Sequence, residues 1–158
     1  MTLAKRYKPQ ELEPRMQELW RQLDIHRFDP QSKLPVFSVD TPPPYVSAAH
    51  LHVGHAMSYT QAEIIVRFKR MQGFEVFYPM GFDDNGLPTE RYVEKHHGID
   101  KRSIERGQFI ELCLEETRKG ARTYRELWER LGLSVDWTRT YSTIAPESRR
   151  TSQLSFSR

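Results

Sequence analysis

The segment from Thr41 to His55 constrains the fold of this chain more than any other stretch. It follows a short apolar run and opens an amphipathic one, which is the order of a strand, a loop and a helix. Three prolines, Pro42 to Pro44, hold the chain extended before the helix, and Gly54 lets a ligand approach the backbone closely. The pattern therefore predicts a strand-to-helix junction, where the first helix amides can bind an anion such as a phosphate group.

Two apolar runs, residues 36–39 and 74–78, flank this helix and predict two strands. A strand, a helix and a second strand form a βαβ unit, whose strands are parallel and whose crossover is right-handed. The sequence thus predicts an α/β fold with a Rossmann-like parallel sheet. Ligands bind at the C-terminal ends of such strands, so we expect the loops at residues 42–55 and 79–90 to converge. Apolar residues mark one face of the predicted helix: Met57, Ile64, Ile65, Phe68 and Met71.

Further helical patterns precede and follow this unit. Residues 1–34 predict an N-terminal helical arm, whose end is marked by Asp29-Pro30, and residues 35–158 predict the first half of a Rossmann domain. A long helix is expected over residues 103–131 with Gly132 as its C-cap, and Pro146 opens a last helix. Apolar residues recur at helical spacing in the arm: Leu12, Met16, Leu19, Trp20 and Leu23.

The composition narrows the class of protein. No apolar run approaches the roughly 20 residues that a membrane helix needs, so we expect no membrane association. The N-terminus lacks the apolar core of a secretory signal and Cys113 is the single cysteine, which favours a cytoplasmic location. A net charge of +3 permits a polyanionic partner without requiring one. Four basic residues are interpreted as solvated helix faces: Lys69, Arg70, Arg149 and Arg150.

The histidines His50, His52 and His55 allow three interpretations: phosphate binding, metal ligation, or polar residues at a helix start. His52 and His55 are three residues apart and share one helix face. Zinc needs further ligands, and Cys113 has no Cys-x-x-Cys partner, so we expect no metal site here. The preceding strand and prolines favour phosphate binding, in which imidazoles stabilise the charge that develops on a reacting α-phosphate.

Residues 81–90, Gly-Phe-Asp-Asp-Asn-Gly-Leu-Pro-Thr-Glu, follow the second predicted strand. One interpretation is a plain turn in which Asp84 caps a helix. The other is a binding loop, because a carboxylate at the C-terminal edge of a parallel sheet can hold the ammonium group of a small substrate. Asp83 is the candidate for that role. Trp137 is interpreted either as the wall of an apolar pocket or, by preference, as a core residue.

Taken together, these residues resemble the class I aminoacyl-tRNA synthetases, whose first signature is His-x-Gly-His. The matching tetrad is His52-Val53-Gly54-His55. Residues 40–47, 81–91 and 132–138 extend the resemblance over nearly the whole chain and are most similar to the N-terminal catalytic region of the valine-specific enzymes. The isoleucine and leucine enzymes share a Gly-x-Asp-x-x-Gly-Leu-Pro loop, and a fragment of either remains an alternative.

The resemblance implies a reaction and the residues that perform it. Valine and ATP, the latter with Mg²⁺, would form valyl-adenylate, which then acylates tRNA(Val) without a covalent enzyme intermediate. The implied catalytic residues are His52 and His55. The implied ATP-binding residues are Ser47, His52, Gly54 and His55. The implied amino-acid-binding residues are Pro43, Pro44 and Asp83.

Three departures from the family pattern qualify the resemblance. At Ala48-Ala49-His50, many relatives have a glycine, and their loop has one residue fewer before the leucine that corresponds to Leu51. The second signature, Lys-Met-Ser-Lys-Ser, is absent, since Met57-Ser58 follows Ala56. The editing domain, which rejects threonine, and the anticodon-binding helices are also absent. We therefore expect a truncated or split gene product, whose missing half a partner chain would supply. Two further alternatives are a non-catalytic nucleotide-binding module and a small adenylyl- or cytidylyltransferase.

Overall fold

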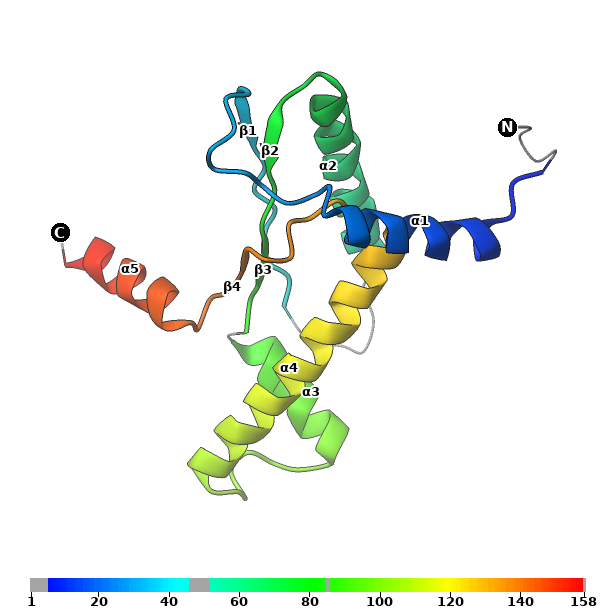
Figure 1. Cartoon of the computed structure of the whole chain (residues 1–158). Coiled ribbons are helices and arrows are strands. Elements are labelled where there is room, and N and C mark those ends of the chain that lie inside the picture. Colours follow the sequence, from blue (N-terminus) through cyan, green and yellow to red (C-terminus); the bar gives the residue numbers. More distant parts are fainter. Residues whose placement is uncertain (1–5, 46–51, 85, 158) are drawn as a thin grey trace.

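The computed structural model describes residues 6–45, 52–84 and 86–157 (Figure 1). A first helix precedes a run of alternating strands and helices. The elements are α1 (Pro9–Leu23), β1 (Val36–Ser38), α2 (Val53–Met71), β2 (Glu75–Phe77), β3 (Met80–Phe82), α3 (Leu87–His97), α4 (Arg106–Leu131), β4 (Thr140–Ser142) and α5 (Pro146–Phe156). The predicted βαβ unit is β1, α2 and β2, and its two strands are parallel, which confirms that part of the prediction.

The chain from residue 75 to residue 83 is the middle segment of two successive two-stranded parallel sheets, β1-β2 and β3-β4. β1 pairs with β2 and β4 pairs with β3, both in parallel. The odd-numbered residues of this segment form hydrogen bonds with the chain on one side. The amides of Glu75 and Asp83, for example, donate to the carbonyls of Pro35 and Pro44. The even-numbered residues form hydrogen bonds with the chain on the other side, where the carbonyls of Tyr78 and Phe82 accept from the amides of Asp136 and Thr143. Successive peptide groups of a strand point to opposite edges, so β1 and β4 flank the middle segment on opposite sides. This arrangement confirms the predicted α/β fold.

The hydrophobic core centres on Trp128 of α4. This side chain is fully buried, and its ring lies 5.0 Å from that of Tyr59, 5.8 Å from Tyr124 and 5.9 Å from Phe82. The ring of Trp137 stacks on it at 6.3 Å, which confirms the core interpretation of Trp137. Aromatic rings from α2, α4, β3 and the segment before β4 therefore hold the sheet and the helices together.

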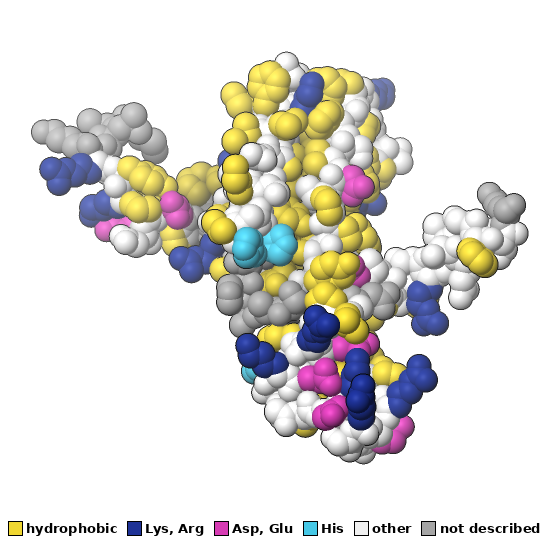
Figure 2. Space-filling model, turned by 180° about the vertical axis from the view of Figure 1, so that it is seen from behind, with side chains coloured by type: hydrophobic (Ala, Val, Ile, Leu, Met, Phe, Trp, Pro, Cys, Tyr) yellow, Lys and Arg dark blue, Asp and Glu magenta, His cyan; other side chains and the backbone are white. Residues whose placement is uncertain are grey.

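The side of helix α2 that packs against the rest of the protein is not the side predicted from its apolar residues. Its buried residues are Tyr59, Glu63 and Val66. The predicted apolar face is exposed along its whole length, up to 86% at Met71, and contributes to the hydrophobic surface in Figure 2. Glu63 can lie inside because its carboxylate accepts hydrogen bonds from the Ser134 amide at 2.9 Å and from Arg67 at 2.7 Å. Periodicity thus predicted the helix but not its packed side.

Helices α3 and α4 form a hairpin that extends away from the sheet (Figure 1). The turn interpretation of residues 81–90 included a helix, but the N-cap of α3 is Gly86, with φ at 99°, and not Asp84. α4 begins at Arg106, three residues later than expected, and Gly132 ends it with φ at 77°, as predicted. β3 and β4 were missed. No helix among the described residues is long and apolar enough to cross a membrane.

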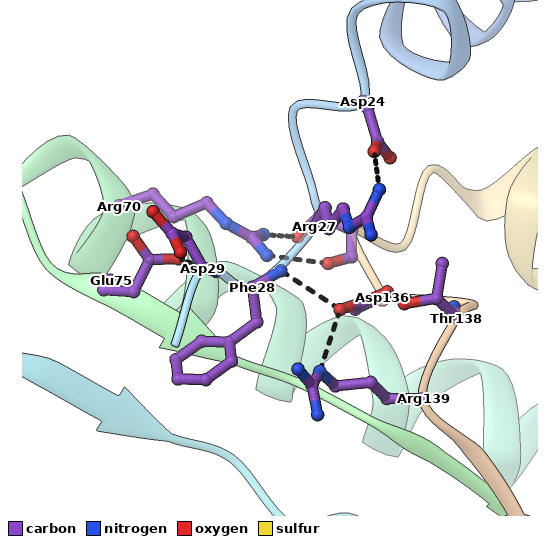
Figure 3. Close-up of polar contacts among 10 residues, drawn as sticks. Asp24, Arg27, Phe28, Asp29, Arg70, Glu75, Asp136, Thr138 and Arg139 are labelled. Carbon is purple, nitrogen blue, oxygen red and sulfur yellow. Dashed lines mark hydrogen bonds and ion pairs between the residues drawn. The ribbon is translucent and has the colours of Figure 1, made fainter. Parts of the chain in front are cut away.

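The N-terminal arm docks beside the segment that precedes β4 (Figure 3). The Phe28 amide donates to Asp136 at 3.0 Å, and Gln17 donates to the carbonyl of Glu129 at 2.8 Å. α1 already ends at Leu23, because Asp24 adopts a left-handed conformation with φ at 49°; the expected end at Asp29-Pro30 was wrong.

Arg70 is not the solvated residue that its sequence context suggested. Its guanidinium donates to the carbonyl of Ser134 at 2.9 Å and to the hydroxyl of the same residue. Burial lowers the pKa of Arg70, although the guanidinium stays charged. Lys69 lies 4.7 Å from the ring centre of Phe74 and 5.3 Å from that of Phe37, so it too covers apolar surface.

Candidate functional site

The C-terminal ends of the strands bring the two predicted loops together. The Asp83 amide donates to the carbonyl of Pro44 at 3.0 Å, and Tyr45 forms a parallel bridge with Asp83. Pro44 is buried and Pro43 is half-buried. The expected convergence of the loops is thus confirmed for these residues, and the two candidates for binding an amino group, Asp83 and the proline backbone, are neighbours.

Two hydroxyl groups at the end of β4 hold the acidic pair. Thr143 Oγ1 donates to Asp83 Oδ1 at 2.9 Å and accepts from the amide of Asp84 at 3.2 Å. Ser142 Oγ donates to Asp84 Oδ2 at 2.5 Å. Sequence reasoning missed both hydroxyl residues, because it treated residues 134–143 as a turn-rich segment. No local pattern pointed to them, because the pairing of β3 with β4 brings the ends of strands that are far apart in the sequence to one edge.

His52 is the N-cap of α2. Its Nδ1 accepts a hydrogen bond from the Gly54 amide at 3.0 Å, so Nδ1 carries no proton and Nε2 is the N–H donor. The His52 side chain is exposed, which leaves this donor at the surface. A Cβ at Gly54 would lie 3.1 Å from His52 Nδ1, so a larger residue at position 54 would crowd the ring. Glycine at this position therefore supports the orientation of His52.

His55 lies in the first turn of the same helix. The rings of His52 and His55 are 6.1 Å apart and nearly perpendicular. The Nδ1 atom of His55 is buried and has no hydrogen-bond partner among the described residues. The two imidazoles stand at a helix N-terminus, where free amide groups and the helix dipole favour an anion. Figure 2 shows histidine side chains immediately below the hydrophobic surface to which α2 contributes. Ser47 and His50 lie outside the described residues.

Tyr59 connects the histidine helix to the proline segment and was not among the predicted site residues. Its phenol donates to the carbonyl of Pro42, and its ring packs on Trp128. Burial raises the pKa of Tyr59 to about 12, so the phenol stays protonated and can donate this bond. The neighbouring hydroxyl of Thr41 is buried and interacts with the phenols of Tyr59 and Tyr78.

In the described ranges, one group of at least three His, Cys, Asp or Glu side chains is arranged to hold an ion, and it lies on α3 and α4: His96, His97 and Glu116. Helix amides and imidazole donors attract anions, whereas the Asp83 carboxylate attracts cations. The end of the sheet thus combines an anion-binding feature with a cation-binding one, which suits a substrate carrying an ammonium group beside a phosphate.

The sequence matches a family model described as tRNA synthetases class I (I, L, M and V) over residues 15–158. Among curated proteins, the chain is similar to a valine--tRNA ligase of Rickettsia prowazekii (strain Madrid E), with 50% identity over 153 residues. A valine--tRNA ligase of Rickettsia felis is 49% identical over the same length. These matches cover 96% of this chain and 19% and 18% of the relatives, so the chain spans about a fifth of their length.

A solved structure has the same fold. It is the agnB2 LeuRS of Agrobacterium radiobacter K84 in a ternary complex with tRNA and LeuAMS, with a TM-score of 0.78 and 25% identity. The match covers 96% of this chain and 17% of that one. The parallel fold, the histidine tetrad at the start of α2 and the family match agree with one another. This chain belongs to the class I tRNA synthetases of the isoleucine, leucine, methionine and valine group.

Proposed function

We propose that this chain forms part of the active site of a valine--tRNA ligase and takes part in making valyl-adenylate. The observation that carries the proposal is the position of Asp83 beside Pro44 at the end of the sheet from which α2, with its His-Val-Gly-His tetrad, begins. The two Rickettsia relatives, about half identical to the chain, support valine as the amino acid.

In the proposed reaction, a carboxylate oxygen of valine attacks the α-phosphorus of ATP. A bond from that oxygen to phosphorus forms, the bond from phosphorus to the bridging oxygen breaks, and pyrophosphate leaves with that electron pair. His52, donating from Nε2, and His55 would stabilise the charge that develops on the phosphate oxygens. Asp83 and the backbone at Pro43 and Pro44 would hold the valine ammonium group. A hydroxyl of tRNA(Val) would then attack the carbonyl carbon of the adenylate, so that an ester bond forms, the bond from that carbon to the phosphate oxygen breaks, and AMP leaves.

ATP would bind through Ser47, His52, Gly54 and His55. The free amides at the start of α2 and the protonated Nε2 of His52 suit phosphate oxygens. Mg²⁺ would be held chiefly by the phosphates, because the one cluster of metal-ligating side chains in the described chain lies on α3 and α4. When bound, the ion would offset the charge of the leaving pyrophosphate.

The same proposal assigns the parts of the chain. Residues 1–34 would be the helical arm, and residues 35–158 the first half of the Rossmann catalytic domain. The remaining half of the catalytic site would come from sequence outside these residues, in the same polypeptide or in a partner chain. A cytoplasmic location is part of the proposal and agrees with the free thiol of Cys113.

A second candidate is activation of leucine or a related aliphatic amino acid. It is favoured by the likeness to the agnB2 LeuRS, which was solved with LeuAMS. A hydrophobic pocket discriminates between aliphatic side chains that differ by one methylene by only about 10- to 200-fold, so the distinction has to be measured.

The test is calorimetric binding of non-hydrolysable valyl-, isoleucyl-, leucyl- and threonyl-adenylate analogues to the 158-residue chain. We expect the valyl analogue to bind most tightly and to raise the melting temperature by mass action. Asp83→Asn and His55→Ala should weaken it, whereas Asp100→Asn, an exposed carboxylate in the turn after α3, should not. Tighter binding of the leucyl analogue would favour the second candidate. Binding of ATP without selectivity for any adenylate would favour a nucleotide-binding module.

A further inference from the structure

A second cluster of chemically competent side chains lies on the α3–α4 hairpin, away from the adenylate site (Figure 1). His96 and His97 are the last two residues of α3, and Glu116 lies in the middle of α4. Each offers one ligand atom, and the three atoms all lie within 4.8 Å of one another. Among the residues that the structure describes, this is the one such group.

Glu116 is the unusual member, because it is a buried carboxylate. It is only 5% exposed, although it belongs to a helix with one solvated side. Burial of a carboxylate is costly unless the charge is paired. The partners are Lys119, whose ammonium lies 2.8 Å from Oε1, and His97, whose Nε2 lies 3.4 Å from the same oxygen. The same oxygen of Glu116 thus faces both a cation and an imidazole.

The separation between His97 and Glu116 suits zinc. Bonds of about 2.0–2.1 Å from a tetrahedral Zn²⁺ to nitrogen and oxygen place two ligand atoms about 3.3–3.4 Å apart. The observed distance from Nε2 of His97 to Oε1 of Glu116 is 3.4 Å. His96 stacks on Tyr92 with ring centres 5.4 Å apart and is exposed, so it can turn toward the ion by rotation of its side chain alone. Two imidazoles and one carboxylate form a ligand set that zinc accepts, with water in the fourth position.

We propose that His96, His97 and Glu116 form a Zn²⁺ site that clips the end of α3 to α4. Binding requires Lys119 to leave Glu116. Lys119 also lies 2.8 Å from Oε1 of Glu115, so its ammonium keeps a carboxylate partner after that movement. A bound ion would join the last two residues of α3 to the middle of α4, and it would thereby stabilise the hairpin. This proposal does not depend on adenylate formation.

The test is a calorimetric titration with ZnCl2 of the 158-residue chain. The chain is purified without a histidine tag. We expect one ion per chain and a rise in melting temperature. Co²⁺ should replace the zinc and give the intense visible absorption of a tetrahedral site. A chain that is folded by circular dichroism but binds Zn²⁺ with a dissociation constant weaker than about 1 mM would overturn the proposal.

Matched variants identify the ligands. Glu116→Gln keeps the size of the buried side chain, and His97→Ala changes an exposed position; each should weaken Zn²⁺ binding at least tenfold. Glu111→Gln changes an exposed carboxylate of α4 outside the cluster and should leave binding unchanged. The double variant His52→Ala/His55→Ala should also bind normally. Loss of binding in the double variant, or its retention in both Glu116→Gln and His97→Ala, would place the ion elsewhere and contradict the proposal.

Discussion

Beside the segment that precedes β4, the buried carboxylates of Glu63 and Asp136 have both oxygens hydrogen-bonded or ion-paired, whereas two buried polar atoms near the C-terminal ends of the strands have no partner among the described residues. Asp136 accepts from the Phe28 amide and from both the amide and hydroxyl of Thr138, and it lies 3.5 Å from Arg139 (Figure 3). At the other end, His55 Nδ1 and Asp84 Oδ1 have no partner among the described residues, and in the core Trp128 Nε1 shares this property.

This difference separates polar groups that hold the fold from polar groups available for binding. A buried carboxylate that is fully hydrogen-bonded stabilises one arrangement of the chain and has no capacity left for a ligand. A buried polar atom without a partner costs about 1–3 kcal/mol of stability, a cost that is characteristic of functional sites. The arm end of the sheet is therefore the structural end, and the Asp83 end is the candidate for binding.

The largest effect is expected for Asp136→Ala at the structural end. The variant leaves the amides of Phe28 and Thr138 without their acceptor, and we expect a loss of about 3 kcal/mol in the free energy of unfolding. Urea denaturation measures it. Asp24→Asn, which weakens an exposed ion pair with Arg27 in the same arm, should change stability by less than about 0.5 kcal/mol. Equal losses in the two variants would contradict the distinction between buried and exposed carboxylates.

Asp83→Asn should give the complementary result at the binding end. Loss of a charge-assisted hydrogen bond to an ammonium group corresponds to about 1.5–3 kcal/mol, or roughly 10- to 100-fold weaker binding of the valyl-adenylate analogue. The urea midpoint should change little, because Asn can still accept from Thr143. Asp136→Ala is the control, since its folded population should bind with normal affinity. A large loss of stability in Asp83→Asn would mean that Asp83 is structural.

His26 should make the stability of the arm end depend on pH. Burial, followed by the charges of Arg70 and Arg67, lowers the pKa of His26 to about 4 from its ordinary value of 6.5. The unfolded chain thus binds the proton more readily between these values, and stability is fully present above pH 6.5 and falls toward pH 4. We expect a loss of about 1–2 kcal/mol after allowance for solvent screening.

Urea denaturation of the parent chain and of His26→Gln across that range measures this contribution. The parent chain should lose more stability than the variant as the pH falls toward 4, because the variant has no imidazole to protonate. Asp136, whose pKa is lowered by hydrogen bonds from Thr138 and Phe28 despite its burial, titrates in both proteins and cancels in the comparison. Parallel profiles would show that His26 does not contribute.

The smallest effect is expected for Thr143→Val. The variant removes the hydroxyl that joins Asp83 to the amide of Asp84, and the adenylate analogue should bind roughly two- to tenfold more weakly. Calorimetry measures this change. Thr143→Ser restores a hydroxyl at the same position and should regain most of the affinity, and a failure of that rescue would show that the methyl group matters instead.

Local patterns predicted much of the fold. The βαβ unit, the C-cap at Gly132 and the helix beginning at Pro146 were all expected, because propensity and capping act within a few residues. Strands β3 and β4 are as short as β1 and β2, but their sequences, Met-Gly-Phe and Thr-Tyr-Ser, contain no continuous apolar run, so each is defined by its partner rather than by its own sequence. The adjacency of Pro44 and Asp83 was predicted from a rule about parallel strands, not from either loop alone.

The sequence by itself determined the family, the parallel α/β class and the residues proposed to bind ATP and valine, since motifs and periodicity depend on near neighbours along the chain. Only the tertiary structure decided that α2 packs through Tyr59, Glu63 and Val66, because pairing Glu63 with the Ser134 amide offsets the cost of burying its charge. It also decided which distant groups meet. Thr143 joins Asp83, and His97 joins Glu116, because strand pairing and helix packing bring together residues that no local pattern relates.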